Sequence, residues 1–202
     1  MNKGQAMNRS IAVRIVQAYH QALARLITVA ERLSEEELTT PPQPGAQPIA
    51  FHLWHIARWA DHLQAALPGM TTTLDHRLGP GQEVWEMEQM AVRWGFAAET
   101  LGHAETGMGM RDDQSAALPW PSKRALLDYT KAVFRLAERA TRAVDDELFL
   151  SAEAPQPRTA GIWVTGSTVG DALLTHLTHT NRHLGMIECL AGLFTGSGTA
   201  TI

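Results

Sequence analysis

Histidines gather in two short stretches of this chain, and histidine is the side chain that most often binds a metal ion in proteins. Six of the nine histidines lie in the ranges 51–62 and 176–185. His179 and His183 are four residues apart, so in a helix they lie one above the other on the same face and can hold one ion. A third histidine from a neighbouring helix would complete a three-nitrogen site with open coordination positions. Such a site is typical of catalytic rather than structural metal centres.

These histidines need rigid elements to position them, and the spacing of apolar residues predicts four long helices. The expected helices cover residues 10–33, 48–67, 122–144 and 167–194, and Ser34 is expected to cap one further helical turn. Residues 39–47, 70–81 and 152–166 are expected to be loops, and residues 82–101 a mixture of helix and loop. No alternating strand pattern competes with this interpretation. The sequence therefore predicts an all-α protein, one domain over residues 1–202, built as a four-helix bundle with a long excursion between helices 2 and 3.

Composition narrows the class of protein. The chain has 202 residues, of which 45% are apolar, and its formal net charge is −4. The mild acidity and the lack of a basic block argue against nucleic acid or an anionic membrane as a partner. No apolar run is long enough to span a bilayer, and the first residues lack a signal-peptide pattern. The single cysteine, Cys189, cannot form a disulfide within the chain, which fits a cytoplasmic location.

On a helical wheel the histidines of the last helix fall inside its apolar stripe. That stripe consists of Val169, Ala172, His176, His179, His183, Met186, Ile187, Leu190 and Phe194. A buried imidazole must satisfy both ring nitrogens, so these residues need either a hydrogen-bond network or a metal. The wheel leaves two pairs open, His176 with His179 or His179 with His183.

The second predicted helix leaves a similar choice. Its apolar face is formed by Ile49, Leu53, Ile56, Ala60, Leu63 and Leu67. His52 and His55 lie on one flank of this face, with Trp59 and His62, and the wheel does not say which of the first two would bind metal. We expect His52, His62 and His176 to be structural or to hold the free N–H of a ligand ring. His20, His76 and His103 stand apart and are interpreted as ordinary residues.

Two motifs resemble those of a known family. The segment 54–61, Trp-His-Ile-Ala-Arg-Trp-Ala-Asp, resembles the second-helix motif of the DinB-like metalloenzyme superfamily. The segment 179–188 resembles its last-helix motif, in which two histidines four apart are followed by x-Gly-x-Ile. Residues 34–38 and 94–96 are also similar to one branch of the superfamily. At Met186 the chain departs from the glutamine that is frequent in the family.

The resemblance implies a fold, a site and a chemistry. Members are four-helix bundles, often homodimers, and hold a divalent metal with one histidine from the second helix and two from the last. Carried over to this chain, the pattern selects His55, His179 and His183. Characterised relatives include bacillithiol S-transferases, mycothiol-dependent maleylpyruvate isomerase and the N-terminal domain of sulfoxide synthases.

An ion bound by three neutral imidazoles keeps its full charge and acidifies a coordinated thiol or water. Our leading hypothesis is therefore a metal-dependent transferase that joins a low-molecular-weight thiol to an electrophilic small molecule. Metal-dependent hydrolysis is the first alternative. A non-catalytic stress or binding protein with a structural metal, or a histidine network without metal, are the others.

The reactive groups around such an ion are less well defined by the sequence. Zinc suits three nitrogens and a water, although nickel, iron and manganese also bind imidazole. Asp61 and Glu188 are candidate catalytic bases, but both residue types more often lie at the surface or in interfaces. Cys189 lies well off the histidine face and is expected to be neither ligand nor nucleophile. The tryptophans of the excursion, Trp85 and Trp94 among them, are expected in the core, a pocket lid or an interface.

Overall fold

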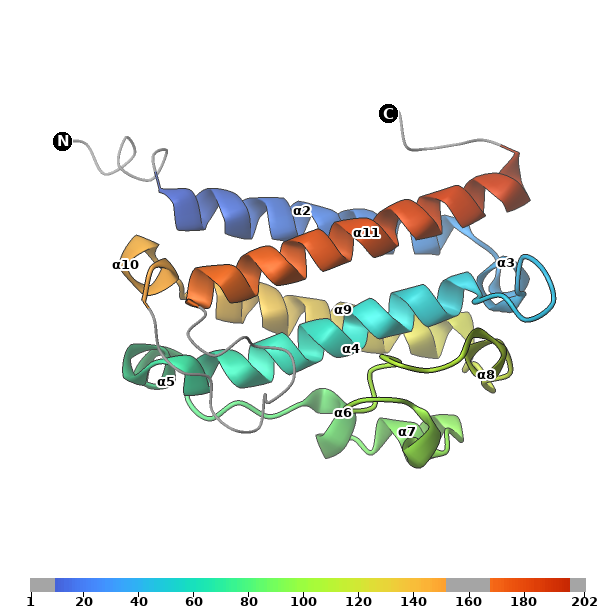
Figure 1. The fold of residues 1–202 in the computed structure, drawn as a ribbon, viewed down its shortest axis with the longest axis horizontal. Coiled ribbons are helices and arrows are strands. Elements are labelled where there is room, and N and C mark those ends of the chain that lie inside the picture. Colours follow the sequence, from blue (N-terminus) through green and yellow to red (C-terminus); the bar gives the residue numbers. More distant parts are fainter. Residues whose placement is uncertain (1–9, 152–167, 197–202) are drawn as a thin grey trace.

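The computed structural model describes residues 10–151 and 168–196, and its framework is four long helices (Figure 1). They are α2 (Ile11–Arg32), α4 (Ile49–Ala66), α9 (Lys123–Thr141) and α11 (Val169–Thr195). All four agree closely with the predicted ranges. The described residues contain no β-strand, and the predicted all-α class is confirmed. None of the described helices is both long and apolar enough to cross a membrane.

Local signals in the sequence set where these helices begin. The hydroxyl of Ser10 accepts a hydrogen bond from the backbone N–H of Val13 at the start of α2. Ser122 caps α9 in the same way, and Thr168 caps α11 with Asp171 in a reciprocal capping box. Each cap satisfies a backbone donor that the first helical turn would leave unpaired. The short helix α3 (Glu35–Thr39) begins with the predicted Ser34 cap.

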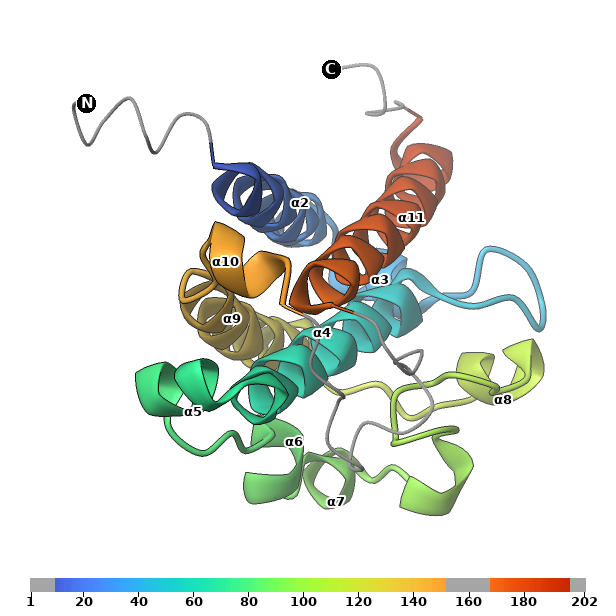
Figure 2. The same ribbon diagram turned by 60° about the vertical axis from the view of Figure 1, so that its left-hand side comes forward.

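The order of the helices in the bundle explains the long excursion. In Figure 1, α2 and α11 run in one direction, whereas α4 and α9 run side by side in the opposite direction. Because α4 and α9 are parallel neighbours, the chain must travel back along the bundle between them, about 27 Å for an 18-residue helix. Residues 67–122 make this return. In Figure 2 they lie on the side of α4 that faces away from α2.

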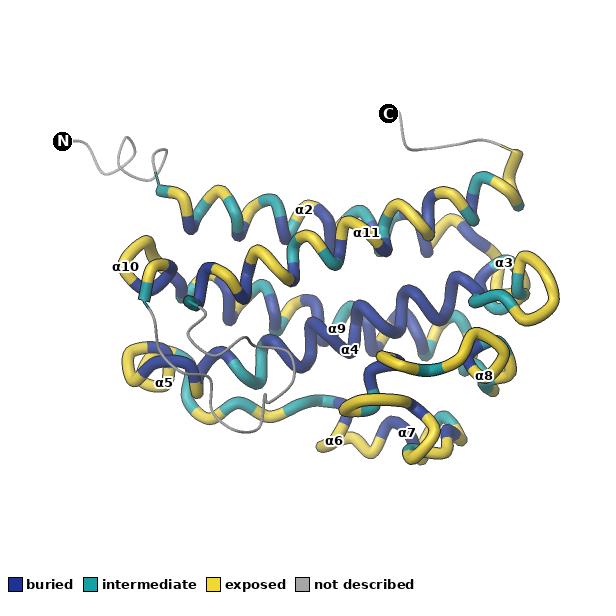
Figure 3. The backbone as a smooth tube through the Cα atoms, viewed as in Figure 1, coloured by how far each residue is buried: buried dark blue, intermediate teal, exposed yellow. Residues whose placement is uncertain are grey.

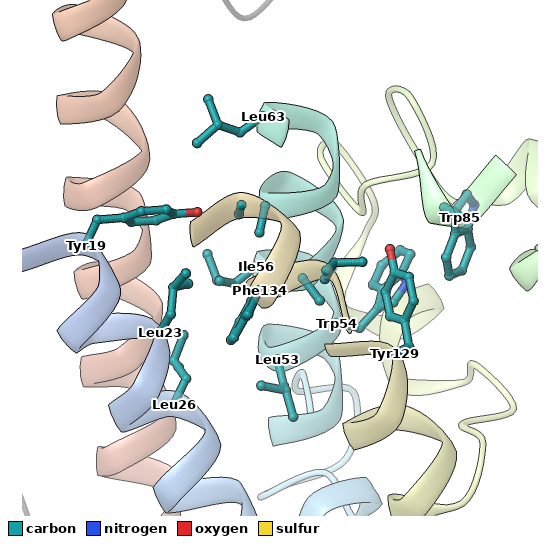
Figure 4. Packing of buried hydrophobic residues seen from close by; sticks show 14 of the residues in the cluster. Tyr19, Leu23, Leu26, Leu53, Trp54, Ile56, Leu63, Trp85, Tyr129 and Phe134 are labelled. Carbon is teal, nitrogen blue, oxygen red and sulfur yellow. The ribbon is translucent and has the colours of Figure 1, made fainter. Parts of the chain in front are cut away.

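The helix α4 is the centre of the molecule. It packs against α9 and α11 and is covered elsewhere by residues of the excursion. Every residue from Ile49 to Leu63 is buried, and α4 is the most continuously buried helix in Figure 3. On the other side of the core, Leu23 and Leu26 of α2 approach Phe134 of α9 (Figure 4). A helix buried on all faces must satisfy each polar group it carries inside the protein.

The excursion contains more helix than the sequence predicted. Its helical segments are η1 (Leu67–Met70), α5 (Thr72–Leu78), α6 (Val84–Met87), α7 (Met90–Trp94), η2 (Ala98–Thr100) and α8 (Asp112–Ala116). The loop predicted over residues 70–81 is therefore wrong, because Thr71 caps α5 and Leu74 anchors it with no exposed surface. The mixed helix and loop expected over 82–101 is confirmed. A short helix α10 (Asp146–Phe149) follows α9, and the loop predicted over 152–166 lies outside the described residues.

Candidate metal centre

Three histidines from two adjacent helices meet in the middle of the bundle. His55 comes from α4, and His179 and His183 come from α11. One ring nitrogen from each of them lies within 4.8 Å of the other two. The Nε2 atoms of His55 and His179 are 3.1 Å apart, and the ring centroids of His179 and His183 are 4.7 Å apart. Two nitrogens that each lie about 2.1 Å from one zinc ion would be separated by a similar distance.

The structure distinguishes between the alternatives that the helical wheel left open. The cluster contains His55 and not His52 from α4, and it contains His183 and not His176 as the partner of His179. These are the three residues that the family resemblance implied. His52 also faces α11, but it contacts only the Nδ1 atom of His183 and lies outside the cluster.

A backbone carbonyl fixes the proton of the His55 ring. Nδ1 of His55 lies 2.5 Å from the carbonyl oxygen of Thr106, so this nitrogen carries the hydrogen and donates it. The lone pair is then on Nε2, the atom that faces His179. The indole N–H of Trp59 donates to the same Nε2 over 3.2 Å, so an ion bound there would compete with this hydrogen bond. Carbonyl-bound imidazoles of this kind are typical of metal ligands.

A second contact orients His183. Its Nδ1 lies 3.1 Å from Nδ1 of His52, and one of the two nitrogens must carry the shared proton. When His183 is the donor in this contact, its lone pair lies on Nε2, the atom that would bind an ion. His52 is therefore in the position expected of a residue that holds a ligand ring.

The site keeps its histidines uncharged. Burial lowers the pKa of His55 to about 3 and that of His179 to about 4, and burial together with the neighbouring imidazoles also lowers the pKa of His183. The pKa of His52 falls to about 4 for the same primary reason, burial. Neutral imidazole is the form that binds metal, so near pH 7 no proton has to leave before an ion can bind.

The two other histidines of the motifs lie beside the centre. His176 is buried, and its ring is 6.2 Å from that of Trp59. Within the described residues, His62 forms no hydrogen bond with the three clustered histidines. Its Nδ1 donates instead to Glu83 over 2.7 Å. Sequence reasoning missed Glu83, Trp59 as a donor and the Thr106 carbonyl.

The turn that carries Thr106 has an unusual backbone. Ala104 and Glu105 have φ values of 49° and 51°, in the left-handed region that favours glycine, and Gly107 has a φ of 85°. A Cβ atom on Gly107 would lie 2.9 Å from ring atoms of both Phe51 and Trp54. Glycines at 102, 107 and 109 are typical of irregular backbone, but they do not indicate which carbonyl faces a histidine.

The two candidate bases are both buried within the described residues, although their residue types were expected at the surface or in an interface. Asp61 has no exposed surface and accepts hydrogen bonds from the backbone N–H groups of Val84 and Trp85 and from the Tyr129 hydroxyl. Glu188 is 9% exposed and forms an ion pair with Arg25 over 2.8 Å. These contacts explain the burial of both carboxylates without a catalytic role.

Two further expectations for α11 have different outcomes. Cys189 is an exposed free thiol, in agreement with its predicted place off the histidine face. Met186 was placed on the apolar stripe, but 41% of it is exposed. The next residue, Ile187, is fully buried, so Met186 lies at the border of the stripe rather than within it.

The donor set fits a divalent ion. The three clustered nitrogens are neutral, two of the rings are held by other contacts, and no carboxylate belongs to the cluster among the described residues. Imidazole ligands suit zinc, nickel, iron and copper better than magnesium or calcium. His55, His179 and His183 would hold the ion, which would keep positions open for a second reactant.

Comparisons with known proteins agree with this fold and these motifs. The sequence profile of the DinB superfamily matches residues 18–187. A crystal structure of a conserved protein from Enterococcus faecalis is similar, with a TM-score of 0.69 and 16% identity over 93% of this chain and 98% of that chain. At this identity the likeness concerns the fold alone. No curated protein gives a significant match. The profile covers both histidine motifs and most of the bundle, and the chain belongs to the DinB superfamily.

Proposed function

We propose that this protein is a metal-dependent transferase that joins a low-molecular-weight thiol to an electrophilic small molecule. The observation that carries the proposal is the cluster of three neutral imidazole nitrogens from His55, His179 and His183. A divalent ion in such a site, with zinc as the first choice, lowers the pKa of a thiol or water that coordinates it.

The chain's own residues would prepare the site for this chemistry. Thr106 holds His55 in the tautomer that presents Nε2, and His52 orients His183. Burial excludes bulk water from the imidazoles and keeps them unprotonated, so proton competition with a metal is weak near neutral pH. His179 is only partly buried, which leaves a path from solvent to the cluster.

The reaction forms a carbon–sulfur bond and breaks two bonds, the S–H bond of the thiol and the bond from carbon to its leaving group. The thiol sulfur attacks an electrophilic carbon, a carbon–sulfur bond forms, and the leaving group departs with its electron pair. The thiol proton passes to solvent. Neither Asp61 nor Glu188 is proposed as the base, because the hydrogen bonds and the ion pair described above already occupy both carboxylates. By analogy with the superfamily we further propose a cytoplasmic homodimer.

The test is the thiol dependence of activity in zinc-loaded protein. Consumption of 1-chloro-2,4-dinitrobenzene would be followed with and without bacillithiol, mycothiol, glutathione or cysteine. His179→Ala should abolish the thiol-dependent rate, and His76→Ala, which removes an exposed histidine of α5, should not change it.

Two results would overturn the proposed transferase. Hydrolysis of an ester such as 4-nitrophenyl acetate without any thiol, lost in His179→Ala, would favour the hydrolase. No activity with either probe, combined with a fold that melts when the metal is removed, would favour a structural metal.

A further inference from the structure

A cavity of about 710 Å³ lies beside the C-terminal half of α4, apart from the three clustered histidines. Its walls come from α4, from the segment 81–87 that includes α6, and from the turn at residues 104–105. α6 packs alongside α4, as Figure 2 shows. The side chains with chemistry on these walls are Arg58, His62, Glu83, Glu86, Trp85 and Glu105. We call this the acidic cavity, because three glutamates line it. Its volume is in the range of small-molecule sites.

The guanidinium in the acidic cavity is not available to a ligand. Nε of Arg58 donates to the Glu105 carbonyl, and Nη2 donates to Glu83 and to the Ala104 carbonyl. The remaining nitrogen, Nη1, faces Asp61 and the Tyr129 hydroxyl. All five N–H groups of an arginine are thereby used, so an anion could bind only by displacing these partners.

Carboxylates dominate the remaining charge. Burial alone would raise the pKa of Glu83, but its hydrogen bond from His62 and the charge of Arg58 hold this pKa below its ordinary value. Oε2 of Glu105 accepts a hydrogen bond from the Trp85 indole over 2.6 Å, and Oε1 has no hydrogen-bond donor among the described residues. Glu86 is exposed. Three carboxylates therefore line the acidic cavity, against one guanidinium that Asp61 also neutralises.

His62 supplies an unused hydrogen-bond acceptor on the same wall. His62 is 7% exposed, and its Nδ1 donates to Glu83. In the neutral form of this tautomer the lone pair lies on Nε2. This Nε2 atom is buried and has no hydrogen-bond partner within residues 10–151 and 168–196. An N–H donor from a ligand would restore the hydrogen bond that the ring lost on leaving water.

We propose that the acidic cavity binds a small organic cation with N–H donors, an ammonium or a guanidinium. One N–H would be donated to His62, and the positive charge would face Glu105 and Glu83. The ring of Trp59 separates the two sites, 5.8 Å from that of His62 and 6.1 Å from that of His55. The ligand would thus lie beside the candidate metal centre without depending on an ion in it.

The test uses the metal-free full chain with ¹³C-labelled alanine and methionine methyl groups. Ala65, Ala66 and Met87 line the acidic cavity and report binding there. The probes are butylammonium and butylguanidinium, with butanol and butyrate of the same length as neutral and anionic controls. Zinc and magnesium are added in separate titrations.

We expect saturable shifts of these three methyl groups with the two cations and not with butanol or butyrate. Glu105→Gln keeps an oxygen for the Trp85 indole but removes the charge, and it should weaken the cation Kd by about fivefold or more. Glu86→Gln, at an exposed position, should weaken it in the same direction. Glu99→Gln, which removes an exposed charge outside the acidic cavity, should leave the Kd unchanged.

The proposal is wrong if the cations cause no saturable shift in the well-folded chain, if butanol or butyrate binds equally well, or if only metal ions shift these methyl groups. An unchanged cation Kd in both Glu105→Gln and Glu86→Gln would also overturn it. Because every titration with an organic probe is carried out without metal, these outcomes are independent of whether the thiol transferase is correct.

Discussion

Replacing Asp61 with asparagine tests whether this carboxylate is part of the framework. Asp61 is fully buried in α4, and its two oxygens bind the backbone N–H groups of Val84 and Trp85, the Tyr129 hydroxyl and the guanidinium of Arg58. Asparagine removes the charge that faces Arg58 and turns an NH₂ group toward one of the N–H donors. The wild-type contacts fasten the start of α6 to α4.

The expected cost follows from these contacts. Removing one partner of a buried ion pair destabilises a protein by about 3–5 kcal/mol. Glu83 still neutralises Arg58 in the variant, so we expect the free energy of unfolding to fall by about 3 kcal/mol, the lower end of this range. The matched control is Glu188→Gln, whose ion pair with Arg25 is more exposed and should contribute about 1 kcal/mol or less.

The assay is urea unfolding of both variants and wild type, analysed by linear extrapolation. The m-value should be unchanged, so the loss appears as a lower midpoint. The reasoning is refuted if Asp61→Asn unfolds within about 1 kcal/mol of wild type and yet loses the acidic limb of the pH–activity profile. That pair of results would make Asp61 a catalytic base.

Two further predictions concern the turn and one isolated histidine. Gly107→Ala should cost about 2–4 kcal/mol, because its φ of 85° strains any side chain and its Cβ would lie 2.9 Å from Phe51 and Trp54. Gly109→Ala has a similar φ of 83° but meets no atom within 4 Å, so a loss as large as that of Gly107→Ala in urea unfolding would contradict the steric argument. Burial lowers the pKa of His20 to about 4, so between its ordinary pKa and 4 the unfolded chain binds a proton that the folded chain does not. The contribution of His20 to the free energy of unfolding is complete well above pH 6.5 and should fall by up to about 1.4 kcal/mol at pH 5.5. The measurement is the difference in unfolding free energy between wild type and His20→Asn, at pH 5.5 and at pH 7.5. If the difference in unfolding free energy between wild type and His20→Asn is the same at both pH values, the prediction for His20 is wrong.

The long helices and the histidine pair of α11 could be predicted because their signals are periodic. Apolar spacing places the buried face of α2 and α9, and side chains four apart must share a face. On α4 the same reasoning could not choose between His52 and His55. This helix is buried all round, so its apolar face does not tell which flank meets α11. The family motif supplied that choice.

Other parts of the site have weak signals or none in the sequence. The Thr106 carbonyl is a backbone atom, and its place beside His55 depends on a turn with three residues at positive φ between 104 and 107. Asp61 was expected at the surface or in an interface, although Arg58 three residues earlier could have indicated a buried pair on one face of α4. Thr71 is a residue type that often caps helices, so the start of α5 was also visible in the sequence, although residues 70–81 were expected to be a loop.

The central claim is that His55, His179 and His183 hold one divalent ion. The most direct measurement is the metal content, by inductively coupled plasma mass spectrometry, of protein purified without a histidine tag. Near-stoichiometric metal in wild type and in His76→Ala, and its loss in folded His179→Ala, is the predicted result. Wild-type protein that binds no metal, even after incubation with zinc, nickel, iron and manganese, would contradict the account and leave the three histidines as a buried hydrogen-bond network.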